Sequence, residues 1–375
     1  MTEPAEAALD GVRLALDPGA GPCRIVLDGD RIAEVRPSTV DRGLLAAPGY
    51  IDLQVNGAVG VDLATEPERL DEVARALPRF GVTAFAPTAI TCSPDATRRA
   101  LAAAAPHDAD TSGGATHLGW HLEGPFLSPA RVGAHSLRHI RPPDAAEVET
   151  WLDGRAAPRL VTIAPELAGA AEVIDALVSS GVVVAAGHSD ATAEELATAG
   201  RHGVTLVTHL GNATGGLAAR DPGIVGAALD PRWTGFASLI LDGLHLHDVT
   251  ARTFLAALGD RAVVVSDCIA ATGLGDGDHH LGDRRVVVRD GVARTADGVL
   301  AGSTMPLGVA IHRAVAAGVC SLRAAVAAAT VAPARLLGEA DRGRIGPGAR
   351  ADIVLLDDTG RLVETIIAGR SANSG

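Results

Sequence analysis

The sequence VVVAAGHSDATAEELATAGRHGVTLVTH, residues 182–209, has the pattern of one strand–helix–strand unit. Two apolar runs, Val182–Ala186 and Val204–Thr208, flank a stretch of helical composition at Ala191–Gly200. Short, nearly continuous apolar strands are typical of a parallel sheet that helices cover on both faces. The segment therefore predicts two neighbouring parallel strands that are connected by a helix.

The same alternation extends in both directions along the chain. Helical stretches such as Glu68–Phe80 and Ala168–Ser180 separate most of the apolar runs. The six further runs are Gly49–Val55, Val82–Pro87, Leu118–Leu122, Leu160–Ala164, Ala237–Leu241 and Ala262–Ser266. Eight strands that alternate with helices predict a (β/α)8 TIM barrel, which belongs to the α/β class.

Both ends of the chain have a different, β-rich pattern. Residues 11–47 contain short alternating segments separated by Gly, Asp and Pro, and residues 346–368 repeat this style. Neither end alone has enough strands for a stable sheet. We therefore predict a small β-sandwich domain built from both termini, residues 1–47 plus 344–375, beside a barrel catalytic domain at residues 48–343.

Composition excludes several classes of protein. The 375 residues are 47% hydrophobic and 21% charged, which is enough apolar material for a large core and excludes a disordered chain. A net charge of −13 without any basic run argues against binding nucleic acid, and 2% aromatic residues argue against base stacking. All 32 basic residues are arginine, so Schiff-base lysines, P-loop lysines and a carbamylated lysine between two metals are excluded.

The cysteines and the N-terminus indicate a cytoplasmic protein. Cys23, Cys92, Cys268 and Cys320 lie far apart with no CxxC pair, which fits neither a disulfide framework nor a zinc ribbon. The acidic N-terminus lacks the apolar segment of a signal peptide. Because no apolar stretch reaches membrane-spanning length without a Gly or a charge, we expect no membrane association.

Chemically capable side chains follow strand after strand in the predicted barrel. They are Gln54, Asn56, Glu123, Glu166, His188, His209, Asn212, Asp242, His245 and Asp267. Barrel enzymes have their active sites at the carboxyl ends of the strands, so these residues are expected to converge on one mouth. Packing alone does not explain polar residues that gather at one end of the strands.

Two histidines and one glutamate have the pattern of a metal site. His188 and His209 lie 21 residues apart, about one strand–helix repeat, and Glu123 ends an earlier strand. Two imidazoles and one carboxylate that leave a position open for water are a ligand set of catalytic zinc. Either histidine alone is more often a buried residue bonded to backbone, but the combination with Glu123 favours the metal.

Three further residues are candidates for the chemistry of such a site. Asp267 follows the last strand, where a carboxylate can exchange a proton with an activated water, although an Asp that caps the next loop is the ordinary alternative. His245 is placed to polarise a substrate carbonyl or to bind a hydroxyl. Arg220, in a Gly-rich loop, suits bidentate binding of an anion, but its position alone favours a solvated surface arginine.

A set of motifs gives the chain a family resemblance. The motifs are Pro48–Gly57 (PGYIDLQVNG), His121–Pro125 (HLEGP), Gly187–Asp190 (GHSD), Thr208–Ala213 (THLGNA), Arg220–Gly223 (RDPG), Leu241–His245 (LDGLH), Ser266–Asp267 and Ala301–Ser303 (AGS). With these motifs in this order, the chain resembles the amidohydrolase superfamily and, within it, the N-acetylglucosamine-6-phosphate deacetylases. The resemblance covers nearly the whole chain.

The resemblance implies a role for each matching residue. It assigns one divalent metal per subunit to Glu123, His188 and His209, with Zn²⁺ expected first and Fe²⁺, Co²⁺ or Mn²⁺ as alternatives. It makes Asp267 the catalytic acid/base, with His245 steadying the developing oxyanion. The implied substrate contacts are Ala134, His135, Asn212, Ala213, Arg220, Asp242, His245, Leu300, Ala301 and Gly302. In the family, the counterpart of Arg220 reaches the sugar phosphate of the neighbouring subunit, which implies a homodimer.

Two departures from the wider pattern bear on metal and substrate. Gln54 and Asn56 stand where the superfamily usually has His-x-His, and amides are poor ligands for a transition metal, so a second metal is not expected. The segment Leu210–Asn212 lacks an aromatic residue that the family often has there, which leaves the exact sugar open.

The expected reaction is metal-dependent hydrolysis of the acetamide of N-acetyl-D-glucosamine 6-phosphate to D-glucosamine 6-phosphate and acetate. One alternative is a deacetylase of another N-acyl amino-sugar phosphate, such as N-acetylgalactosamine 6-phosphate. A cyclic amidase is a second alternative, although the lack of lysine and of His-x-His argues against it. A metal-free binding relic of the fold is a third alternative, and the intact set of Glu123, His188, His209 and Asp267 argues against it.

Overall fold

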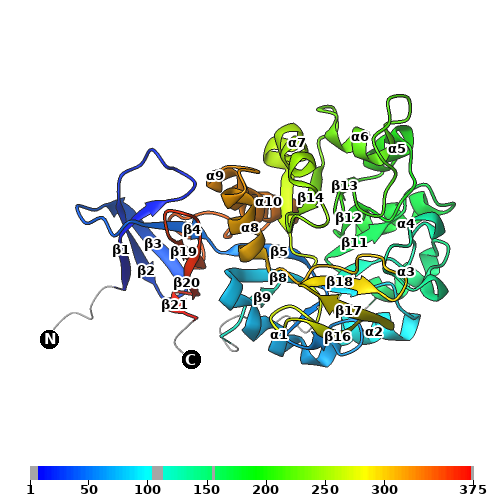
Figure 1. The fold of residues 1–375 in the computed structure, drawn as a ribbon, viewed down its shortest axis with the longest axis horizontal. Coiled ribbons are helices and arrows are strands. Elements are labelled where there is room, and N and C mark those ends of the chain that lie inside the picture. The colour runs from blue at the N-terminus through cyan, green and yellow to red at the C-terminus, as the bar shows by residue number, and fades with distance from the viewer. Residues whose placement is uncertain (1–6, 104–112, 154–156, 373–375) are drawn as a thin grey trace.

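The computed structural model describes residues 7–103, 113–153 and 157–372. It consists of a barrel of parallel strands surrounded by helices and, at one side, a separate sheet in which both ends of the chain lie together (Figure 1).

Eight parallel strands form the barrel, in an order that follows the chain. They are β5 (Tyr50–Val55), β8 (Val82–Ile90), β10 (His121–Glu123), β11 (Leu160–Ile163), β12 (Val183–Ala186), β13 (Val204–Val207), β14 (Phe236–Ile240) and β15 (Ala262–Val265), with the short β9 (Thr116–His117) beside β8. A parallel bridge between Val55 and Cys268 brings β5 next to the end of β15. The predicted (β/α)8 barrel is therefore confirmed.

The helices pack apolar faces on the outside of the strands. Those of the described residues are α1 (Leu70–Ala76), α2 (Pro94–Ala103), α3 (Ala145–Leu152), α4 (Ala170–Ser179), α5 (Ala193–Arg201), α6 (Gly223–Leu229), α7 (Asp248–Leu258), α8 (Leu307–Ala316), α9 (Leu322–Ala329) and α10 (Val331–Leu337). Single 3₁₀ turns occur at Pro67–Arg69, Leu77–Phe80, Pro129–Arg131, Leu137–His139 and Gly259–Arg261. A capping box of Thr192 and Glu195 begins α5, which explains why this helix starts sharply after the β12 loop. None of these helices has the length and apolar character that crossing a lipid bilayer requires.

The terminal sheet combines strands from both ends of the chain. Its order is β21 (Arg370–Ser371), β20 (Leu362–Ile367), β19 (Ile353–Leu356), β4 (Leu44–Pro48), β1 (Ala8–Leu14), β2 (Cys23–Asp28) and β3 (Arg31–Pro37). The strands predicted as a β-sandwich thus belong to one hydrogen-bonded sheet, with a core that includes Ile25, Ile32 and Ile353. Residues 1–6 and 373–375 of the predicted domain lie outside the described residues, and its exact boundaries stay a prediction.

A small antiparallel sheet follows the last barrel strand and was not predicted. It comprises β16 (Gly277–Leu281), β17 (Arg284–Arg289) and β18 (Val292–Thr295), and a two-stranded ribbon, β6 (Gly57–Ala58) and β7 (Val61–Asp62), lies at the end of β5. The Asp62 carboxylate at the end of this ribbon accepts a hydrogen bond from the Gly282 amide at 2.8 Å. Leu281 and Ile90 share one buried apolar cluster, so the small sheet is attached to the carboxyl end of the barrel.

Candidate active site

A cavity of about 290 Å³ lies at the carboxyl ends of the barrel strands. Its wall contains the predicted site residues Glu123, Ala134, His135, His188, His209, Asn212, Ala213, His245, Asp267, Leu300 and Gly302. Asn56, Ile90, Gly133, Ile240, Leu281 and Val299 complete the lining. The topology therefore brings residues that are up to 246 positions apart, Asn56 and Gly302, to one mouth, as expected for a barrel.

Four residues of this cavity other than glycine have a positive φ: Ala213 and three residues that each lie two positions after a barrel strand. His188, His209 and Asp267 follow β12, β13 and β15 with φ of 49°, 30° and 52°. A positive φ is uncommon for residues other than glycine, because the Cβ atom crowds the backbone. Such conformations cluster at functional sites, where the surrounding structure over-determines them.

Glu123 is the centre of a buried cluster of imidazoles. Its Oε1 lies 2.9 Å from Nε2 of His209 and 3.1 Å from Nε2 of His188, and its Oε2 lies 3.6 Å from Nε2 of His135. Burial by itself raises the pKa of Glu123, but the neighbouring imidazoles of His135, His188 and His209 outweigh it and hold the pKa well below its usual value. Glu123 is therefore a carboxylate.

The orientation of His188 fits a metal ligand. Its Nδ1 lies 2.9 Å from the Arg131 carbonyl oxygen, which can only accept, so Nδ1 is the donor of this hydrogen bond. Nε2 is thereby the nitrogen left for a metal, and when it carries no proton, as metal binding requires, its lone pair faces a Glu123 oxygen and needs a cation between the two atoms. The separations of 2.9–3.1 Å approach the edge of about 3.4 Å for a tetrahedron around zinc with bonds of about 2.1 Å. The residues present fit a divalent metal.

His135 lies closer to this cluster than the sequence suggested. The ligand atoms of Glu123, His135 and His188 all lie within 4.8 Å of one another. Burial lowers the pKa of His135 to about 4, with the neighbouring imidazole of His188 adding to the effect, so the ring is neutral at physiological pH. The sequence predicted His135 only as a substrate contact, because it lies in a loop between two 3₁₀ turns and no strand spacing points to it.

Asp267 lies on the wall of the same cavity. Burial, followed by the negative charge of Glu123, raises the pKa of Asp267 to about 6. Its Oδ1 accepts a hydrogen bond from Asn56 Nδ2 at 2.8 Å, and its backbone carbonyl accepts one from the Ser303 amide at 2.8 Å. A carboxylate with a pKa close to neutrality is suited to accepting and returning a proton.

His245 is oriented by Asp242. Asp242 Oδ2 lies 2.8 Å from His245 Nδ1, and Oδ1 accepts the backbone amides of Leu244 and His245, each at 2.9 Å. Burial pushes the pKa of Asp242 up, but the hydrogen bond and charge of His245 outweigh it and lower that pKa to about 2. Asp242 is thus ionised and accepts the Nδ1 proton, which leaves Nε2 of His245 available to a substrate.

His121, two residues before Glu123, supports the strand beneath the cavity. Its Nδ1 lies 3.1 Å from the Leu53 carbonyl oxygen and its Nε2 lies 2.8 Å from the Thr162 hydroxyl. Burial lowers the pKa of His121 to about 4, so the neutral ring donates to Leu53 and accepts from Thr162. Both ring nitrogens of His121 are therefore engaged in hydrogen bonds inside the barrel.

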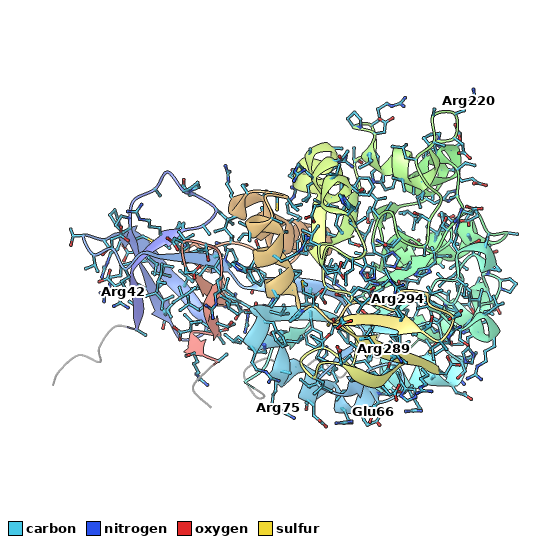
Figure 2. The ribbon with its side chains drawn as sticks, in the orientation of Figure 1. Arg42, Glu66, Arg75, Arg220, Arg289 and Arg294 are labelled. Atoms are coloured by element: carbon cyan, nitrogen blue, oxygen red, sulfur yellow. The ribbon has the colours of Figure 1, made fainter. Side chains whose placement is uncertain are left out.

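Three predicted substrate contacts do not line the cavity. Asp242 lies behind His245, and Ala301 is fully buried in the apolar cluster beneath Leu300 and Gly302. Arg220 is exposed at the outer end of the loop between β13 and α6 (Figure 2). The roles assigned to these residues stay predictions.

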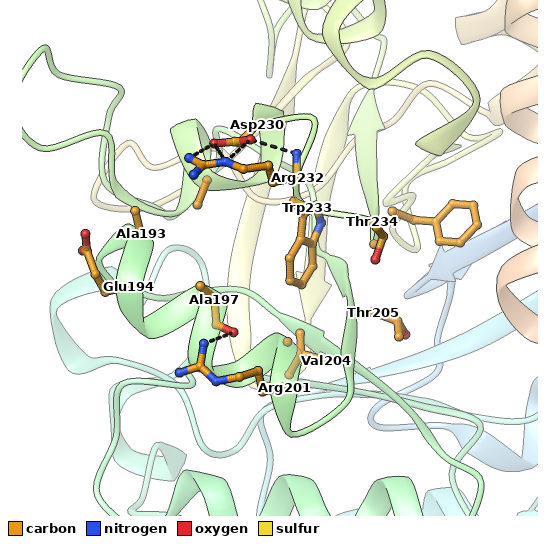
Figure 3. Close-up of a pocket in the computed structure, with 14 residues that line it drawn as sticks. Ala193, Glu194, Ala197, Arg201, Val204, Thr205, Asp230, Arg232, Trp233 and Thr234 are labelled. Carbon is orange, nitrogen blue, oxygen red and sulfur yellow. Dashed lines mark hydrogen bonds and ion pairs between the residues drawn. The ribbon is translucent and has the colours of Figure 1, made fainter.

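A larger cavity, of about 560 Å³, lies elsewhere on the barrel (Figure 3). It is lined by residues of α5 and by Trp233, next to Val204 and Phe236 at the amino ends of β13 and β14. Barrel active sites lie at the opposite, carboxyl end of the strands. Size alone therefore does not locate the chemistry, and we place the site at the Glu123 cluster.

Comparison with known proteins agrees with this geometry. A model of the amidohydrolase family matches residues 45–372. The chain belongs to the amidohydrolase family. N-acetylglucosamine-6-phosphate deacetylase of Homo sapiens is 37% identical to this amidohydrolase over 367 residues, which cover 93% of this chain and 88% of the human protein. N-acetylgalactosamine-6-phosphate deacetylase of Escherichia coli O157:H7 is 34% identical over 332 residues, 88% of each chain.

Solved structures of related enzymes share the whole fold of this amidohydrolase. N-acetylglucosamine-6-phosphate deacetylase from Thermotoga maritima superposes with a TM-score of 0.89 at 33% identity, over 97% of this chain and 99% of that one. An alanine mutant of the Mycobacterium smegmatis deacetylase, in complex with N-acetyl-D-glucosamine-6-phosphate, superposes with a TM-score of 0.86 at 32% identity, over 98% and 97%. The resemblance found in the sequence is confirmed.

Proposed function

We propose that this amidohydrolase hydrolyses the acetamide of N-acetyl-D-glucosamine 6-phosphate, giving D-glucosamine 6-phosphate and acetate. The observation that carries the proposal is the Glu123 carboxylate facing imidazole nitrogens of His188 and His209 in one cavity with Asp267. The human and Thermotoga maritima relatives, which carry the name of this activity and align with nearly the whole chain, support it.

The metal of the proposed reaction is one divalent ion per chain, held by Glu123, His188 and His209, with Zn²⁺ expected and Fe²⁺, Co²⁺ or Mn²⁺ as alternatives. When bound, such a metal polarises a carbonyl and lowers the pKa of water. Elemental analysis after dialysis should give about one ion per chain. Two per chain would contradict the proposal, because Gln54 and Asn56 offer amides where a second ion needs imidazoles.

The chain's own residues would then perform the proton transfers. Asp267 accepts a proton from the water that adds to the acetamide carbonyl carbon. An N–H group at Nε2 of His245, with both ring nitrogens protonated, donates to the carbonyl oxygen as negative charge develops there. When the C–N bond breaks, Asp267 returns the proton to the amine nitrogen. Water is thereby divided between acetate and the amino sugar, and Asp267 ends in its starting state.

The chain contains no lysine, so arginine, histidine and backbone N–H groups must bind the phosphate. Among the described residues, no arginine lines the cavity. We propose that Arg220 binds the phosphate in the site of a neighbouring subunit, so that the enzyme is a homodimer. Its exposed position at the end of a loop supports this arrangement (Figure 2). We place the enzyme in the cytoplasm, since its four cysteines are unpaired.

A second candidate substrate is N-acetylgalactosamine 6-phosphate. The E. coli O157:H7 relative carries the name of that activity at 34% identity, and Leu210–Asn212 offers no aromatic ring to discriminate between sugars. Both substrates have the same acetamide and the same phosphate, so the metal ligands and Asp267 serve either reaction equally.

Acetate release from a panel of sugars tests the proposal. The panel contains the 6-phosphates of N-acetylglucosamine and N-acetylgalactosamine and the two unphosphorylated sugars. We expect the highest kcat/KM with N-acetylglucosamine 6-phosphate and poor activity without phosphate. Preference for the galactosamine epimer would select the second candidate, and absence of acetate from the metal-loaded protein with every sugar would overturn both.

A further inference from the structure

Two buried amides at the end of β5 each donate a hydrogen bond to a different carboxylate of the site. Gln54 is 1% exposed, and its Nε2 donates to Glu123 Oε1 at 3.0 Å. Asn56 is 3% exposed, and its Nδ2 donates to Asp267 Oδ1 at 2.8 Å. The two residues are two positions apart on an extended chain, so their side chains reach the same side of the barrel mouth.

We propose that Gln54 and Asn56 are positioning residues with separate tasks. Gln54 holds the metal ligand Glu123, and Asn56 holds the proton carrier Asp267. This inference rests on the proposed function, since it gives each amide one step of that chemistry to support.

The contacts of Glu123 define the task of Gln54. Glu123 Oε1 is the oxygen that faces His188 and His209, so its direction decides whether the three ligand atoms can meet one ion. An N–H group on that oxygen restricts rotation of the carboxylate while leaving its negative charge in place. Partners of metal ligands typically contribute 10- to 100-fold in metal affinity or activity.

The contacts of Asp267 define the task of Asn56. The amide N–H occupies Oδ1, which leaves Oδ2 for proton transfer. The backbone amides of Asn56 and Gly57 also donate to the carbonyl oxygen of Cys268, at 2.8 and 3.2 Å. Asn56 therefore ties both the carboxylate of Asp267 and the backbone that follows it to β5.

Asn56 also has an unsatisfied oxygen that a purely structural residue would not need. Its Oδ1 is buried and has no hydrogen-bond partner within the described residues. Leaving a buried polar atom without a partner is costly, and a leucine of similar volume would avoid that cost. Within the described residues, the hydrogen bond to Asp267 is the contact of this side chain that explains an amide at the position.

The test separates the two tasks with Gln54→Leu and Asn56→Leu, which remove each donor at similar volume. Metal affinity is measured by competition with a chromogenic chelator, without substrate, and kcat and KM are measured at saturating metal. For Gln54→Leu we expect metal binding to weaken by about 10- to 100-fold. For Asn56→Leu we expect unchanged metal affinity and unchanged KM, with kcat lowered by about 10- to 100-fold.

A double-mutant cycle shows whether Asn56 acts through Asp267. In an Asp267→Asn background, Asn56→Leu should lower the residual kcat no further, because the proton carrier is already absent. The inference would be overturned by a further loss of kcat in the double variant. It would also be overturned by an equal loss of metal affinity in both leucine variants, or by an unchanged kcat in Asn56→Leu. Gln54→Ala and Asn56→Ala replace any leucine variant that lacks a cooperative thermal transition.

The metal-affinity arm keeps this inference distinct from the proposed function. If the wild-type protein releases acetate from no sugar, the proposed function fails, while the effect of Gln54→Leu on metal binding is still measured. If the wild type is active and Gln54→Leu binds metal as tightly as the wild type, the inference about Gln54 fails while the proposed function stands.

Discussion

Asp267 combines two properties that a residue moving a proton needs. It is buried on the cavity wall, and burial with the charge of Glu123 raises its pKa to about 6. Asp267→Asn keeps the shape of the side chain but cannot accept a proton. We expect kcat to fall by about 10²- to 10⁴-fold, with metal content and thermal stability close to wild type. A variant that retains more than about a tenth of kcat would show that another group moves the proton.

Asp52, beneath the cavity, is a second carboxyl group whose pKa is raised by burial. It is 1% exposed, and its Oδ1 accepts the backbone amides of Gln54 at 3.3 Å and Ser266 at 3.1 Å. Its Oδ2 has no partner within the described residues. Burial raises the pKa of Asp52 from an ordinary value of 3.8 to about 7.

The raised pKa of Asp52 makes stability depend on pH. Between about pH 4 and pH 7 the folded chain holds a proton that the unfolded chain releases, so stability falls as pH rises through this window and levels off above it. Asp52→Asn keeps an oxygen for both amides and removes the titration. We expect the variant to match the wild type near pH 5 and to exceed its Tm at pH 8. Parallel Tm curves for the two metal-loaded proteins across this range would contradict the explanation.

At the scale of elements, the barrel was predictable because its strands are continuous apolar runs. The strand Ala262–Val265, for example, has the sequence AVVV and is buried throughout. The sheet of β16–β18 was not predictable from the sequence. In its first strand, Gly277–Leu281, only Leu281 is buried, and the other residues resemble a polar loop. His279 and His280 both lie in β16, although their polar, Gly- and Asp-rich surroundings resemble a loop.

The site residues that follow barrel strands were predictable from the sequence, whereas those placed by loops or tertiary packing were not. His188, His209 and Asp267 directly follow strands, so topology alone brings them together. His135 approaches Glu123 from a loop, and its place depends on tertiary packing that leaves no periodic trace in the sequence. The hydrogen bond between Asn56 and Asp267 likewise depends on how β5 meets the end of β15.

The start of β19 is tied to its neighbours by a buried ion pair. Arg342 and Asp352 form a salt bridge with side chains 7% and 5% exposed, and Asp352 Oδ1 also accepts the Ala368 amide at 2.9 Å. Asp352→Ala leaves Arg342 buried without its carboxylate, and we expect a loss of about 3–5 kcal/mol in the free energy of unfolding. Urea unfolding measures this loss, with metal affinity unchanged.

A matched control for the buried pair lies on the surface. Arg335 and Asp260 also form an ion pair, but their side chains are 53% and 77% exposed. Asp260→Ala should therefore cost at most about 1 kcal/mol. Equal losses in Asp260→Ala and Asp352→Ala would mean that burial of Arg342 is not what makes the inner pair matter.

At the scale of the whole molecule, binding of the substrate phosphate is the property that one chain does not explain. Arg220 is exposed at the end of its loop, while no arginine within the described parts of the chain lines the cavity. A charge-assisted, bidentate contact is worth roughly 1.5–3 kcal/mol, which corresponds to about 10- to 100-fold in affinity. We therefore expect Arg220→Ala to raise KM for the 6-phosphate sugar by this factor, with little change for the unphosphorylated sugar.

Mixed dimers decide whether Arg220 acts in its own site or in that of its partner. Asp267→Asn inactivates a subunit but leaves its Arg220, and Arg220→Ala leaves a subunit with an intact Asp267. If the arginine crosses the interface, a dimer of the two variants has one complete site, and its KM for the 6-phosphate sugar returns to the wild-type value. If the arginine serves its own chain, each subunit of that dimer lacks one group and the high KM remains. Equal loss of activity toward both sugars in Arg220→Ala would instead mean that this residue supports the fold or the dimer, because only a phosphate contact distinguishes the two substrates.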